Sequence, residues 1–196
     1  LMENRMKSSI LIFLFLMISG IRTSHAACNC EDWMDRGGYC VDYVKSRIPS
    51  FPIPMRDDMP TLKNAEVIEV TEGDVAIFTV KSYWHVAYVE RVHRNAQGEP
   101  ISIDVSEMNL GDELTFQEFR SKWRSASREE WNRALCCGIT DNYDEITTRR
   151  NLDIATVRQI WSPDDAAREA TARGRLKSLM GRVKEVINRF YDLADI

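Results

Sequence analysis

The stretch Gly38–Val44, with the sequence GYCVDYV, places a thiol where a turn becomes a helix. The double glycine Gly37–Gly38 permits a tight turn. The apolar residues that follow recur at helical spacing: Val41, Val44 and Ile48. This pattern puts Cys40 at or near a helix N-terminus, where the helix dipole favours the reactive thiolate. The stretch therefore predicts a nucleophile, and a buried structural cysteine or one half of a disulfide is the alternative interpretation.

An apolar run near the N-terminus predicts export. The run Ile10–Ile18 follows Lys7 and precedes the small-residue sequence Ser24-His25-Ala26. It is too short to span a bilayer comfortably, and cleavage after Ala26 meets the small-residue requirement of signal peptidase. We therefore predict a signal peptide over residues 1–26, a secreted or periplasmic mature protein, and no integral membrane segment after cleavage. A bacterial lipoprotein acylated at Cys28 is the alternative, although His25 stands where such a signal needs a leucine-like residue.

The cysteines help to decide between the two interpretations of Cys40. The chain has five: Cys28, Cys30, Cys40, Cys136 and Cys137. An odd number in an exported chain leaves one thiol over. The other four form two adjacent pairs, so two disulfides that tie the mature N-terminus to the region near residue 136 leave Cys40 free. A four-cysteine zinc site is the rival, but such short gaps are poorly matched to the usual ligand spacing.

Length and composition are those of an ordinary globular protein with one core and an extension. The chain has 196 residues, of which 44% are hydrophobic and 29% are charged. Its formal net charge is −4, and the predicted signal segment carries three basic residues against one acidic residue, so the mature chain is close to −6. A general affinity for nucleic acid is therefore not expected.

Alternating and β-branched residues predict an antiparallel sheet in the first half of the chain. The expected strands are Val67–Val70, Asp74–Val80, His85–Val92 and Ile101–Met108, with a hairpin turn at Asn95–Gly98. Alternation puts His85, Ala87 and Val89 on one face, and the polar residues Glu107 and Asn109 continue an apolar row of the next strand. Antiparallel pairing of these strands brings His85 within reach of both. A core histidine and a fraying strand end are the alternatives for each residue taken alone.

Helical patterns dominate from Thr115 onwards. The expected helices are Thr115–Trp123, Arg128–Leu135, Asn151–Trp161 and one from Pro163 to the C-terminus. The last contains a heptad-like seam of Leu176, Met180, Val183, Ile187, Phe190 and Ala194. We expect this seam to pack on the body of the same molecule, and a helix-mediated dimer is the other interpretation.

Four fragments in this order resemble the CHAP domain, the cysteine, histidine-dependent amidohydrolase/peptidase family. They are Gly38–Val44, Gly73–Ala76, Trp84–Glu90 and Ser106–Asn109. The likeness covers roughly Asp32–Trp123. It implies an α+β, papain-like fold in which an N-terminal nucleophile helix packs on an antiparallel sheet. A CHAP-like catalytic domain would then span residues 27–125, followed by a helical C-terminal extension over residues 126–196.

The resemblance also implies roles for four residues. Cys40 would be the nucleophile and His85 the general base, while Glu107 and Asn109 would orient His85 or support the site. A histidine beside a cysteine stabilises the thiolate and later protonates the leaving amine, and backbone amides at the helix start can hold the oxyanion. The chain departs from the family at Tyr39, where many CHAP proteins have glutamine. The acidic residues around the nucleophile do not reproduce the calcium-binding spacing of some members, so we expect no metal and no cofactor.

The sequence thus predicts an exported cysteine amidase or endopeptidase. The resemblance and the export signal together suggest amide bonds in the peptide part of peptidoglycan as its substrate. One alternative is a disulfide-stabilised secreted protein that keeps a CHAP-like fold for binding without turnover. Another is an exported effector that acts on an amide outside the cell wall.

Overall fold

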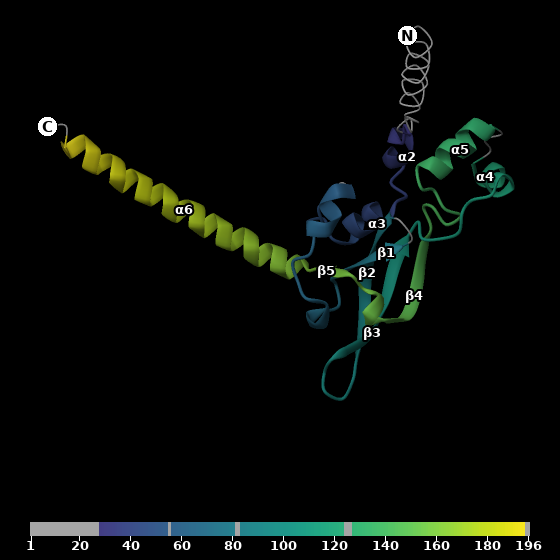
Figure 1. Ribbon diagram of the computed structural model, residues 1–196, viewed down its shortest axis with the longest axis horizontal. Coiled ribbons are helices and arrows are strands. Elements are labelled where there is room, and N and C mark those ends of the chain that lie inside the picture. The colour runs from purple at the N-terminus through teal and green to yellow at the C-terminus, as the bar shows by residue number, and fades with distance from the viewer. Residues whose placement is uncertain (1–27, 55, 81–82, 124–126, 195–196) are drawn as a thin grey trace, which may run out of the picture.

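The structure is a computed structural model that describes residues 28–54, 56–80, 83–123 and 127–194. Side chains are described for these residues except Arg56 and those from residue 186 onwards. The predicted signal peptide, residues 1–26, lies outside the described residues. Within them the protein has an α+β fold, as expected from the sequence (Figure 1).

A five-stranded antiparallel sheet forms the centre of the protein, with the strand order β4-β3-β2-β1-β5. Its strands are β1 (Val75–Val80), β2 (Tyr83–Arg94), β3 (Pro100–Met108), β4 (Ile146–Asp153) and β5 (Gln159–Trp161). β2 and β3 form a long hairpin in which Tyr88 lies opposite Ser106. Gly98 has a φ of 85° in the turn, a conformation that favours glycine. The hairpin predicted from residues 85–108 is therefore confirmed.

Both faces of the sheet are buried. On one face α3 (Cys40–Arg47) packs through Val44 against Val75, Ile77 and Val86. The alternate residues of the same strands, among them Ala87 and Val89, pack on the other face beneath connecting segments. These segments include the short 3₁₀ helices η2 (Val67–Glu69) and η3 (Ile154–Thr156). This double burial explains why the strands are rich in apolar residues at both alternating positions.

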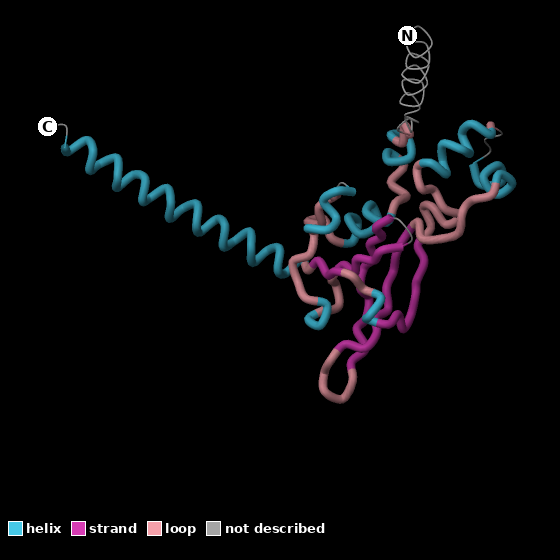
Figure 2. Tube along the Cα trace, in the orientation of Figure 1, coloured by secondary structure: helices cyan, strands magenta, loops and turns pink. Residues whose placement is uncertain are grey.

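Three helices lie beyond the end of the sheet (Figure 2) and share a third apolar cluster. It joins α2 (Glu31–Asp35), α4 (Phe116–Trp123) and α5 (Arg128–Cys136) through Trp33, Phe119 and Ala134. Tyr143, which is fully buried, donates a hydrogen bond from its hydroxyl to the carbonyl of Trp33 at 2.5 Å. The cluster therefore connects the segment before Cys40 with residues more than a hundred positions later.

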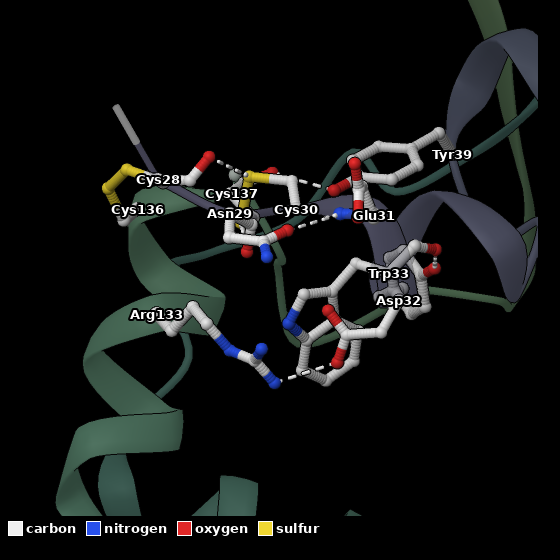
Figure 3. The surroundings of a disulfide bond; sticks show 12 residues. Cys28, Asn29, Cys30, Glu31, Asp32, Trp33, Tyr39, Arg133, Cys136 and Cys137 are labelled. Atoms are coloured by element: carbon white, nitrogen blue, oxygen red, sulfur yellow. Dashed lines mark hydrogen bonds and ion pairs between the residues drawn. A yellow bond between two sulfur atoms is a disulfide. The ribbon is translucent and has the colours of Figure 1, made fainter. Parts of the chain in front are cut away.

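Two disulfides fasten the same region (Figure 3). Cys28 is bonded to Cys136 and Cys30 to Cys137, with Cα–Cα distances of 6.1 Å and 5.6 Å. Cys40 is the free thiol among the described cysteines. The prediction of two bridges between the mature N-terminus and the region near residue 136 is confirmed, and the connectivity, which the sequence left open, is now assigned.

Two of the sequence-based element assignments are wrong. The expected strand Val67–Val70 is a 3₁₀ turn, because Glu69 and Val70 donate backbone hydrogen bonds to residues three positions earlier instead of to a neighbouring strand. The expected helix Asn151–Trp161 consists of the end of β4, η3 and β5. Its apolar residues Leu152, Ile154 and Ile160 contact the sheet cluster. The sheet thus continues past residue 125 into the region expected to be a helical extension.

The last helix, α6 (Pro163–Ala194), projects away from the sheet (Figure 1). Its first turn packs on the body, where Ala166 contacts the cluster that contains Val44, and the described side chains from Ala167 to Glu185 are exposed. Further along, Leu176, Met180 and Val183 are 50–64% exposed. The expectation that the seam packs on the body is therefore wrong for these residues. Among the helices that the structure describes, none combines the length and apolarity needed to span a membrane.

Candidate active site

Cys40 is the first residue of α3, as the sequence predicts. Tyr39 has extended backbone angles and its N–H donates to Asp42 Oδ2 at 3.0 Å, which satisfies an amide at the helix start. Gly38 is required because a Cβ there would collide with the ring of Tyr143. The local sequence thus fixes the thiol at the N-terminus of α3.

His85, at the start of β2, is the partner of this thiol. Its ring is 1% exposed, and Nε2 lies 2.9 Å from Glu107 Oε2. Cys40 and this imidazole line the same pocket, and the interaction with Cys40 is among the causes that raise the pKa of His85. Burial lowers the pKa of His85, but the hydrogen bonds to Cys40 and Glu107 outweigh it and raise the pKa from 6.5 to about 9. The imidazolium is therefore the favoured form beside the thiol at neutral pH.

Glu107 and Arg149 extend the chain of contacts across three strands. Tyr88 pairs with Ser106 and Val105 with Arg149, so the alternation places His85, Glu107 and Arg149 on one face. Arg149 Nη2 donates to Glu107 Oε2 at 2.8 Å, and its Nε donates to Oε1.

The Glu107 carboxylate is fully buried, yet it is the charged form that its surroundings favour. Burial raises its pKa, but hydrogen bonds to His85 and Arg149 outweigh burial and hold the pKa below its ordinary value. Arg149 was not found from the sequence. The β-branched run Ile146–Thr148 was the available signal for β4.

Asn109 is near the site but does not contact His85 through a hydrogen bond. Its Nδ2 donates to the Gly138 carbonyl at 2.9 Å, and its Oδ1 accepts from the Thr140 N–H and hydroxyl at 3.0 Å and 2.8 Å. Its φ of 56° turns the chain at the end of β3. Of the two supporting residues that the sequence offered, Glu107 therefore contacts the imidazole, and Asn109 holds the loop at 138–140.

Two pockets meet at Cys40. The larger, about 500 Å³, is called the polar pocket here, and it lies between the start of β2 and the loop at 138–140. Its lining includes Tyr39, Cys40, His85, Asn109, Glu113 and Thr140. The smaller, about 290 Å³, is called the apolar pocket. It is lined by Cys40, Val41, Pro54, Met59, Tyr83, Trp84 and Val86. Tyr83 and Trp84 line both pockets, and the polar groups of His85, Asn109, Glu113 and Thr140 distinguish the lining of the larger one.

Tyr39, the residue that departs from the CHAP pattern, is held in place by its phenol. The hydroxyl donates to the Cys137 carbonyl at 2.9 Å (Figure 3). The ring packs edge-on against that of Tyr143. Burial, together with negative neighbours, raises the pKa of Tyr39 well above its ordinary value. Its proton is thus used to fasten the wall of the polar pocket. The oxyanion donor offered by this stretch is the backbone N–H of Cys40.

The acidic residues near the nucleophile have structural partners. Asp42 accepts the Tyr39 N–H, and Asp32 accepts a hydrogen bond from Arg133 at 2.7 Å. Within the part of the chain that the structure describes, no group of three histidine, cysteine or acidic side chains is arranged to hold a metal ion.

No family model, no curated protein and no solved structure matches this chain. The likeness to the CHAP domain therefore stays a prediction from the four sequence fragments.

Proposed function

We propose that the protein is a cysteine amidohydrolase or peptidase in which Cys40 is the nucleophile and His85 the general base and acid. The observation that carries this proposal is a free thiol at a helix start that lines the same pocket as a buried imidazole, which Glu107 holds through Nε2. Arg149 in turn holds Glu107, which makes both a positioning pair for His85.

The proposed reaction has two halves. The Cys40 thiolate attacks the amide carbon, so a C–S bond forms and the carbonyl electrons move to the oxygen, which the Cys40 N–H stabilises. The intermediate collapses, the C–N bond breaks, and the imidazolium gives its proton to the departing amine. Water then attacks the thioester as His85 accepts its proton. The C–S bond breaks, which releases the acid and restores the thiolate.

We further propose a peptide amide as the substrate. The resemblance to the CHAP domain and the predicted export signal favour the peptide part of peptidoglycan. The two pockets on either side of Cys40 are compatible with a chain that crosses the thiol.

Alkylation of Cys40 tests the mechanism directly. In the protein with both disulfides intact, iodoacetamide should modify Cys40, and His85→Ala should slow this reaction at least tenfold because the thiolate loses its cationic partner. His93→Ala is the matched control. His93 also pairs with a carboxylate on the β2–β3 hairpin, Asp104 at 2.9 Å, but it lies outside the pocket linings that include Cys40.

Digestion of purified peptidoglycan tests the substrate. Wild type should release fragments with new amino termini that Cys40→Ala does not release, as read by mass spectrometry. Identical fragments from both proteins would end the catalytic assignment, and so would a Cys40 that is oxidised or that reacts equally fast without His85.

A further inference from the structure

The apolar pocket has the chemistry of a side-chain subsite. Its floor is formed by Met59 and Val86, which are 5% and 0% exposed and belong to the same core cluster as Val44. Val41, Pro54 and Trp84 line it and are half-buried. Apart from the Cys40 thiol, none of the described lining residues is acidic or basic. A methyl group placed there would leave apolar surface uncovered. A charged group would lose its hydration without gaining a partner.

His85 determines which half of a substrate meets which pocket. The imidazole lines the polar pocket but is absent from the described lining of the apolar pocket. In the proposed mechanism His85 protonates the departing amine, so the amine half lies on the side of the polar pocket. The acyl half, whose carbonyl carbon bonds to Cys40, is then directed towards the apolar pocket. This step rests on the proposed function.

We propose that the enzyme selects substrates with a bulky apolar side chain, such as leucine or phenylalanine, on the acyl side of the cleaved amide. The side chain fills the apolar pocket and contacts Met59 and Val86. The substrate class is therefore a peptide with a hydrophobic residue at this position. The small and charged residues of cell-wall stem peptides leave the pocket unfilled, so within the proposed function we expect peptide amides with a hydrophobic acyl-side residue to react faster than those of the stem peptides.

Peptidyl chloromethyl ketones measure this selectivity without a requirement for turnover. The thiolate of Cys40 displaces chloride from the methylene carbon, a C–S bond forms, and the residue next to the ketone occupies the acyl-side pocket. We expect the second-order rate constant for the leucine and phenylalanine reagents to exceed that of the alanine reagent by about 10- to 100-fold, with glutamate slowest. Iodoacetamide carries no amino-acid side chain, so its rate constant measures the reactivity of the Cys40 thiol without binding in the apolar pocket.

A charge in the pocket wall provides the matched variant. Pro54→Glu places a carboxylate at the wall and should lower the ratio of the leucine rate to the alanine rate about tenfold. The iodoacetamide rate of the same variant corrects both rates for the effect of the new charge on Cys40. Pro52→Glu is the control, because Pro52 is an exposed residue of the same loop that does not belong to the described lining.

The outcomes separate this inference from the proposed function. Equal rates for alanine and leucine, or a preference for glutamate, with alkylation that still depends on His85, would overturn the apolar subsite and leave the mechanism standing. Loss of leucine selectivity in both proline variants would also overturn it. Alkylation that is independent of His85 would reject the proposed function, and the subsite with it.

Discussion

A buried imidazole and a buried carboxylate form a stable pair here because a third group completes them. Glu107 alone would be costly to ionise inside the sheet. The guanidinium of Arg149 offers two donors in one plane, and its outer part reaches solvent, so the carboxylate keeps its charge without the burial of a second full charge. That charge in turn favours protonation of His85, which faces the thiol. In the proposed mechanism, the reactivity of Cys40 would therefore depend on Arg149, a residue of β4 that has no hydrogen bond to the thiol.

Glu107→Gln should move the alkaline limit of activity. The raised pKa of His85, about 9, means that the imidazolium survives to mildly alkaline pH and is lost as the pH rises through that value. Removal of the Glu107 charge takes away one of the interactions that raise this pKa, so the limit should move to lower pH by about 1 unit, which corresponds to ~1.4 kcal/mol. The measurement is the rate of Cys40 alkylation, or of hydrolysis, between pH 6 and about 10.

Glu90→Gln is the control for this experiment. Glu90 is also an ion-paired glutamate of the β2–β3 hairpin, 2.7 Å from Arg47, but its charge is not among the interactions that shift the pKa of His85. Its pH profile should match wild type. An unchanged profile for Glu107→Gln, or an equal shift in both variants, would contradict the role given to Glu107.

The sequence could predict Cys40, His85 and Glu107 because local patterns determine them. A double glycine with helical spacing placed the thiol, and alternation with a hairpin turn placed the other two on one face. Arg149 joins them only through the pairing of β3 with β4, across an interval of about forty residues that local patterns do not specify. The role of Asn109 was equally hidden, because it depends on a loop that follows α5.

At the scale of elements, the errors fall where short apolar runs lack a clear period. Val67–Val70 is too short for alternation to separate a strand from a 3₁₀ turn, and burial of Val70 under the sheet suits either. In Asn151–Trp161 the apolar residues sit at mixed intervals, because three short elements follow one another and each contributes one contact. Tertiary packing decided both cases, and intrinsic propensity did not.

The two disulfides join α2 to α5 and should act as one loop closure. Each bridge spans 107–108 residues, and a loop of that length is worth about 4.7 kcal/mol of unfolding free energy. Once one bridge is closed, the other closes an effective loop of only a few residues, worth about 2 kcal/mol. Removal of either bridge should therefore cost about 2 kcal/mol, and removal of both should cost about 7 kcal/mol.

Denaturant unfolding of three variants measures this difference. They are Cys28→Ser with Cys136→Ser, Cys30→Ser with Cys137→Ser, and the protein with all four serines. Costs that simply add would contradict the shared loop. The second variant also reports on the site, because the Cys137 carbonyl holds Tyr39 at the wall of the polar pocket, so its alkylation rate at Cys40 should change more than that of the first.

The sheet and the helices packed around it form the body of the molecule, which contains the candidate site. The last helix, α6, projects away from this body. The side chains of α6 described beyond its first two turns are exposed, and its hydrogen bonds there run along the helix itself, from Thr171 to Ala167 and from Arg173 to Glu169. A helix without tertiary contacts contributes little to the stability of the body. The exposed stripe of Leu176, Met180 and Val183 is also the surface through which a helix-mediated dimer, the alternative interpretation of the seam, would form.

Truncation after Arg173 should therefore leave the body intact. It keeps the contact of Ala166 with the core, and the side chains described in the removed part, up to Glu185, are exposed. We therefore expect an unfolding midpoint within about 3 °C of the full chain, equivalent to ~1 kcal/mol, and the same alkylation rate at Cys40. Near-ultraviolet circular dichroism follows the unfolding of the body through its tryptophans. Sedimentation of the truncated chain and of the full chain reports the molecular mass of each. A truncated chain that is monomeric while the full chain is heavier would assign the dimer to α6. A fall in the midpoint of many degrees at concentrations where both are monomeric would contradict the separation of α6 from the body, because such a loss requires contacts that an exposed helix does not make.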